Sequence, residues 1–177
     1  MAVDWKPVSR TAAFVGAGAA GLFWLHALTS ESGFLLLDYA NLAVHEAGHV
    51  IFSLFGLGLG VWGGTLLQLL MPLAFAVHFA RRGETLGTAF GAFWAGENGL
   101  NIARYIADAR AQALPLVGGG EHDWNFILGR LGLLEADTKI AAAVRVAGWA
   151  AMILAVVWVV LRSKKDAAAG RGAGSED

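Results

Sequence analysis

The chain has 177 residues, of which 56% are hydrophobic and 15% charged, and its formal net charge is −1. Such a composition is too apolar for an ordinary soluble domain of this length, and the low net charge provides no basic face for nucleic acid. Cysteine is absent, which excludes disulfides, thiolate nucleophiles and cysteine-ligated metals. The expected partner is therefore membrane lipid, and any metal must be bound by imidazole and carboxylate groups.

Five apolar segments are expected to form helices, and they predict an all-α, polytopic membrane bundle with four or five apolar helices. The segments lie near 11–29, 34–56, 62–80, 85–107 and 140–162. The run Val50–Ala80 has no formally charged residue and exceeds the roughly twenty residues that span hydrocarbon. The first segment is interpreted as a retained helix, because no clear signal-peptide cleavage site follows it.

The pattern along the chain predicts one membrane domain over residues 1–162. A polar extramembrane interval is expected at about 108–139, between the fourth and fifth apolar segments. Residues 163–177, rich in Ala, Gly and charge, are predicted to form a disordered tail.

Basic residues flank the segments in three clusters: Lys6/Arg10, Arg81/Arg82 and Arg162/Lys164/Lys165. Cytoplasmic loops are enriched in Lys and Arg, but five full crossings cannot place all three clusters on that side. If segment 34–56 crosses only in part, four spans put every cluster and both termini in the cytoplasm and the polar interval outside. The glycines that follow this segment would allow the chain to turn back.

Segment 34–56 carries the sequence HEAGH at residues 45–49, the most chemically specific feature of the chain. In a helix, His45 and His49 lie one turn apart on the same face, which lets two imidazoles bind one ion. Glu46 is offset by about 100° and can reach a metal-bound water to accept its proton without being a ligand. Ionisable groups in apolar sequence are costly unless they have partners, which favours metal binding over chance.

This HExxH motif resembles that of the zincin metalloproteases, and its apolar surroundings make the site-2 protease class the closer likeness. The resemblance implies Zn²⁺ bound by His45 and His49, a water polarised for attack with Glu46 as the catalytic base, and peptide hydrolysis near the membrane. In site-2 proteases an aspartate in an LDG-type motif on a later helix is the third ligand. The present sequence contains no such LDG motif.

A catalytic zinc normally has three protein ligands, so a third donor is expected. The first candidate is His122 in the sequence GGGEHDW, with the adjacent Asp123 as an alternative. A second alternative is Glu97, which begins a polar stripe on the fourth segment. Glu97 could also pair with Arg104 or accept the free N–H of a zinc-bound histidine.

The leading functional hypothesis is a membrane-embedded zinc metallopeptidase whose substrate is a membrane-associated peptide. One alternative is a non-hydrolytic metal- or haem-binding membrane protein, in which haem would need a distant ligand such as His78 or His122. Another is a structural accessory subunit of a membrane complex, which would carry no stoichiometric metal.

Overall fold

The structure is a computed structural model that describes residues 3–117 and 121–173. Over these residues the chain forms helices and no strand, which confirms the all-α prediction. The elements are α1 (Arg10–Thr29), α2 (Asp38–Ser53), α3 (Leu57–Arg81), α4 (Thr85–Ala107), α5 (Asp123–Arg130), the 3-10 helix η1 (Leu134–Ala136) and α6 (Asp137–Ala173).

Two segments differ from the sequence-based expectation. The polar interval at 108–139 contains a short helix, α5, followed by η1. Helix α6 continues to Ala173, past the boundary predicted at residue 162, so most of the predicted disordered tail is helical. Residues 174–177 of that tail lie outside the described residues.

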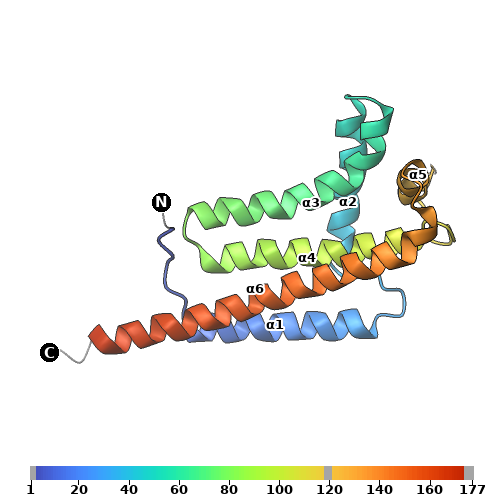
Figure 1. Cartoon of the computed structure of the whole chain (residues 1–177). Helices are drawn as coiled ribbons and strands as arrows, with labels where there is room; N and C mark the ends of the chain where they lie inside the picture. Colours follow the sequence, from blue (N-terminus) through green and yellow to red (C-terminus); the bar gives the residue numbers. More distant parts are fainter. Residues whose placement is uncertain (1–2, 118–120, 174–177) are drawn as a thin grey trace.

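Helices α1, α3, α4 and α6 run side by side as an elongated bundle (Figure 1). The most extensive helix packing joins α4 to α6, where Gly96 faces Gly148. A Cβ atom on Gly96 would lie 2.7 Å from the Gly148 carbonyl oxygen, and one on Gly148 would lie 2.6 Å from the Gly96 carbonyl oxygen. Only glycine at both positions permits this backbone contact, a common mode of helix packing in membranes.

Within the described residues, three helical stretches are long and apolar enough to cross a membrane: α1, α3 and the stretch Leu134–Ala169. Three is fewer than the four or five apolar helices predicted. Large apolar side chains on α1 point away from the protein, and Phe14, Leu22 and Leu28 are each at least 70% exposed. These features are consistent with a membrane protein whose outer surface contacts lipid.

The predicted basic clusters meet at one end of the bundle, on the left in Figure 1. The backbone N–H of Lys6 donates to the carbonyl oxygen of Gly83 in the α3–α4 turn at 2.8 Å. The Lys6 ammonium pairs with Glu84 at 3.0 Å, and Arg162 of α6 donates to the Trp5 carbonyl oxygen at 3.2 Å. The N-terminal segment, the α3–α4 turn and the end of α6 therefore lie together.

Helix α2 runs across the opposite end of the bundle instead of alongside the long helices (Figure 1). It turns back into α3 through Gly56, whose φ of 114° is one that residues with a Cβ rarely adopt. Helix α3 starts beside α2 and then bends to join the bundle (Figure 1). It contains the Gly63–Gly64 pair and Pro72, which are common causes of helix bends.

Candidate metal centre

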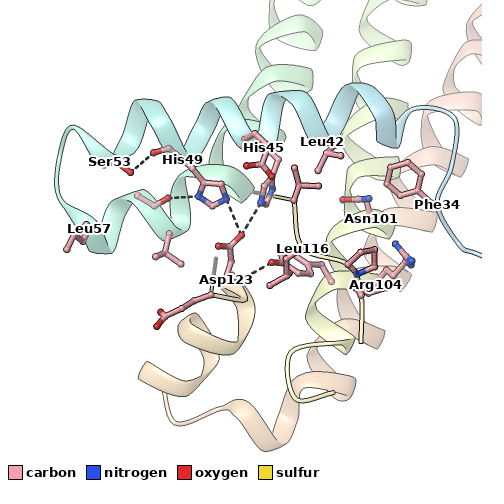
Figure 2. A pocket seen from close by; sticks show the side chains of 18 of the residues that line it. Phe34, Leu42, His45, His49, Ser53, Leu57, Asn101, Arg104, Leu116 and Asp123 are labelled. Atoms are coloured by element: carbon pink, nitrogen blue, oxygen red, sulfur yellow. Dashed lines mark hydrogen bonds and ion pairs between the residues drawn. The ribbon is translucent and has the colours of Figure 1, made fainter. Parts of the chain in front are cut away.

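Two imidazoles and one carboxylate converge at the end of the bundle where α2 lies. His45 and His49 project from one face of α2, with ring centroids 4.7 Å apart. Asp123, the first residue of α5, places its Oδ2 3.0 Å from His45 Nε2 and 3.2 Å from His49 Nε2 (Figure 2). The three atoms all lie within 4.8 Å of one another, as a single bound cation requires.

Two separations in the cluster are near those of a tetrahedral metal site. Metal bonds of about 2.0–2.2 Å to imidazole nitrogen and carboxylate oxygen place two ligand atoms of a tetrahedron about 3.3–3.6 Å apart. The nitrogen-to-oxygen distances of 3.0 and 3.2 Å are a few tenths of an ångström shorter. The three residues could therefore hold a metal ion.

The other ring nitrogen of each histidine is held by an oxygen acceptor. His49 Nδ1 lies 2.8 Å from the Gly60 carbonyl oxygen, which can only accept, so this nitrogen carries a proton. His45 Nδ1 lies 2.9 Å from Gln68 Oε1, and the Gln68 amide nitrogen donates to Asn101 Oδ1 at 2.8 Å. These contacts fix both rings so that their Nε2 atoms face Asp123, the arrangement of ligand histidines in metal sites.

The same carboxylate oxygen faces both rings. With Nδ1 of His49 protonated, its Nε2 can hydrogen-bond to Asp123 Oδ2 only if it also carries a proton. His45 Nε2 lies beside the same oxygen. A metal ion at this point would take the place of the shared proton and would be held by all three side chains.

The pKa values of His49 and Asp123, both outside the three candidate spans, reflect their contact with each other. The hydrogen bond to Asp123 outweighs burial and raises the pKa of His49 to about 9. Burial acts to raise the pKa of Asp123, but the hydrogen bonds to His45 and His49 lower it overall. A raised histidine pKa favours the protonated, metal-free form at low pH. A metal must displace this proton, so binding is favoured as the pH rises toward 9.

Helix α3 packs its backbone directly against the two imidazoles at Gly64. A Cβ atom there would lie 2.5 Å from His45 Nε2 and 2.6 Å from His49 Nε2. On α2, next to His49, a Cβ atom on Gly48 would collide with the carbonyl oxygen of Gly63. The glycines thus allow α3 to approach α2 closely enough for Gln68 and Gly60 to hold the rings.

His122, the first candidate for third ligand, does not join the cluster, and Asp123 does. His122 caps the start of α5, and its Nδ1 accepts a hydrogen bond from the Asn125 N–H at 3.2 Å. Its Nε2 lies 3.4 Å from Asp108 Oδ2, and its ring packs on Tyr105 with centroids 4.1 Å apart. Both nitrogens are directed away from His45 and His49, because α5 begins between His122 and Asp123.

Glu97, the other alternative, is fully buried on α4 and lies outside the metal cluster. Its Oε2 accepts a hydrogen bond from Asn41 Nδ2 at 2.7 Å. Asn41 also donates to Asp38 Oδ1 at 3.3 Å and accepts from the Trp94 indole N–H at 2.8 Å. Glu97 therefore belongs to a buried network that joins α2 to α4. Among the described residues it pairs with neither Arg104 nor a histidine.

Glu46 lines a cavity of about 860 Å³ together with the three clustered residues. Over the part of the chain that the structure describes, its carboxylate has no hydrogen-bond or ion-pair partner, and its charge is close enough to favour the protonated form of His49. Glu46 is therefore open to a molecule in the cavity.

Three supporting residues were not assigned to the site from the sequence. Gln68 and Gly60 orient the rings, and the Tyr105 hydroxyl accepts a hydrogen bond from the Asp123 N–H at 3.3 Å. The sequence offers one signal for these supporting residues, a single glutamine in the apolar run 50–80. Gly60 gives no signal of this kind, because it contributes only a backbone carbonyl group.

The arrangement can thus bind a divalent cation beside an unpaired carboxylate, at the wall of a cavity large enough for a small peptide. Comparisons of this chain with protein families, with curated proteins and with solved structures found no match.

Proposed function

We propose that this protein is a membrane-embedded zinc metallopeptidase. The observation that carries the proposal is the convergence of His45 Nε2, His49 Nε2 and Asp123 Oδ2 within 4.8 Å. Glu46 lines the same cavity and has no partner among the described residues. A ligand set with one vacant tetrahedral position, next to a free carboxylate, is typical of catalytic zinc sites rather than structural ones.

Each protein group has a defined part in peptide hydrolysis. When bound, zinc supplies a Lewis acid that polarises the scissile carbonyl group and acidifies a water near neutral pH. Glu46 accepts the proton of the attacking water and then donates it to the leaving amine. Gln68 and Gly60 keep the Nε2 lone pairs of the two imidazoles directed at the cation. Asp123 contributes the negative charge of the ligand set.

The resemblance to site-2 proteases belongs to this proposal. The two histidines and the glutamate match the HExxH motif on α2, and Asp123 is a carboxylate supplied by a later helix. Its sequence context is HDW instead of an LDG motif. The carboxylate ligand of this chain comes from the short helix α5, which precedes the long apolar helix α6.

A non-hydrolytic metal-binding protein could use the same three ligands, but it has no need of Glu46 or the cavity. A haem would require axial ligands on opposite faces, whereas His45 and His49 present Nε2 to the same point. An accessory subunit would need no metal. The free carboxylate in the cavity favours the hydrolase.

A chelation experiment tests the proposed activity. The full-length protein in phosphatidylcholine nanodiscs, loaded with zinc, is expected to cleave an apolar peptide pool, with products identified by mass spectrometry. Removing zinc with a chelator should abolish cleavage, and adding one equivalent of zinc should restore it. Cleavage that persists in the metal-free protein, or no cleavage with the site fully loaded, would contradict the proposal.

We also propose a topology in which α1, α3, α4 and α6 cross the membrane and α2 does not. Helix α4 has 23 residues and runs beside α3 and α6 (Figure 1), and its polar residues Glu97 and Asn98 are buried in the protein. The three basic clusters then lie on the cytoplasmic side with both termini, and the metal centre lies near the opposite face.

Cysteine labelling tests this topology, because the chain has no cysteine of its own. Exposed positions at the two ends are Lys164 and Ala111. In sealed, right-side-out membranes, a membrane-impermeant maleimide is expected to label Ala111→Cys at once and Lys164→Cys only after permeabilisation. Labelling of both cysteines from the same side would refute four crossings.

A further inference from the structure

The cavity beside the metal centre contains a cation without an anionic partner. Arg104 on α4 lines the cavity and is half-buried. Among the described residues its guanidinium makes no ion pair or hydrogen bond, whereas Arg82, Arg110 and Arg162 each pair with a carboxylate. A half-buried guanidinium offers five N–H donors and favours an anion that can replace lost water.

The stem of Arg104 passes beside Gly33 in the α1–α2 connection. A Cβ atom on Gly33 would lie 3.4 Å from Arg104 Cδ and 3.5 Å from Nε, which is an ordinary van der Waals separation. The φ of 63° at Gly33 favours glycine there. The two glutamates that line the same cavity, Glu46 and Glu121, do not come within ion-pair distance of Arg104. The head group is therefore open to a ligand.

Arg104 lies at one side of the metal centre. Figure 2 shows Arg104 near Phe34 and Asn101, Leu57 near the far end of α2, and the two imidazoles between these groups. The lining between them is largely apolar and includes Leu42, Val61, Leu114, Pro115 and Leu116. An extended apolar peptide that crosses the metal centre would therefore bring one of its ends to Arg104.

We propose that Arg104 binds a carboxylate group of the substrate, so that the site selects apolar peptides with a carboxylate a short distance from the scissile bond. This inference rests on the proposed function, because it concerns the substrate of the same site. A guanidinium binds a carboxylate through two parallel N–H to oxygen bonds, which gives both affinity and orientation. The carboxylate can belong to the C-terminus of the peptide or to an acidic side chain at the same place.

A binding experiment tests the inference without requiring turnover. Zinc-loaded Glu46→Gln protein in phosphatidylcholine nanodiscs is titrated with three fluorescent peptides of the same apolar sequence. The first has a free C-terminal carboxylate, the second a C-terminal amide, and the third an amide together with a glutamate as its last residue. The free acid is expected to bind about 10- to 100-fold more tightly than the plain amide. The third peptide shows whether a side-chain carboxylate serves equally well.

Arginine variants test whether Arg104 causes the preference for the free-acid peptide. Arg104→Met should remove it while leaving binding of the plain amide unchanged, which also shows that the variant is folded. Arg104→Lys should retain part of it. Arg145→Met is the matched control, because Arg145 is exposed on α6 and does not line the cavity; this variant should keep the full preference.

Three results would overturn the inference: equal binding of acid and amide peptides, a preference that survives Arg104→Met, or loss of the preference when phosphatidylglycerol is added. The second would assign the carboxylate to the metal, and the third would assign Arg104 to lipid phosphate. Hydrolysis of the same peptides by the unmodified protein is measured in parallel. A carboxylate preference without cleavage would refute the proposed peptidase and leave the carboxylate site standing.

Discussion

Replacing Asp123 with alanine is expected to lower zinc affinity by more than about 100-fold, because changes to residues that only orient a ligand already cost 10- to 100-fold. The substitution removes the one negative charge of the ligand set and leaves His45 and His49 alone. Purified wild-type protein should contain one zinc per chain by mass spectrometry, and Asp123→Ala should contain almost none after brief dialysis against a weak chelator.

Glu121→Ala is the matched control for this loss. Glu121 is exposed, lines the same cavity two residues before Asp123, and is not part of the three-residue cluster. This control should retain stoichiometric zinc. Full zinc retention in Asp123→Ala would show that the carboxylate is not a ligand, and equal loss in both variants would indicate a general effect of charge in the cavity.

Replacing Glu46 with glutamine is expected to reduce peptide hydrolysis by about 10²- to 10⁴-fold, the usual contribution of a positioned general base. The amide has nearly the same shape as the carboxylate but cannot accept the proton of the attacking water. Zinc content should stay at one per chain, since Glu46 lies outside the cluster of metal-binding atoms. The measurement pairs initial cleavage rates with metal analysis on the same samples.

Glu121→Gln makes the same change of charge in the same cavity and should retain near-normal cleavage. Unchanged hydrolysis in Glu46→Gln would rule out the proposed proton transfer. Loss of zinc together with activity would instead make Glu46 a ligand, contrary to the separate roles proposed for it and for Asp123.

The sequence predicted where each long helix lies, because long apolar runs are a strong local signal, but among the described residues fewer helices than predicted are long and apolar enough to span a membrane. The fourth predicted segment, 85–107, coincides with α4, and the first, 11–29, differs from α1 by one residue. The end of α6 was missed, because the Ala-rich continuation after Arg162 has good helix propensity but no apolar pattern. The bend of α3 and the transverse direction of α2 depend on packing between helices.

The candidate site could be predicted only in part. The i, i+4 spacing of His45 and His49 is a local property of a helix, and it places both rings on one face. The choice between His122 and Asp123 depended on where α5 starts, since adjacent residues point in different directions. The distance from Gln68 to His45 depends on how closely Gly63 and Gly64 let α3 approach α2.

X-ray absorption at the zinc edge measures the ligand set directly. For the zinc-loaded wild-type protein, we expect about four nitrogen or oxygen ligands near 2.0–2.1 Å, two of them with the multiple-scattering signature of imidazole. Protein purified with zinc that binds none, or a zinc ion with fewer than two imidazole ligands, would contradict the proposed centre of His45, His49 and Asp123.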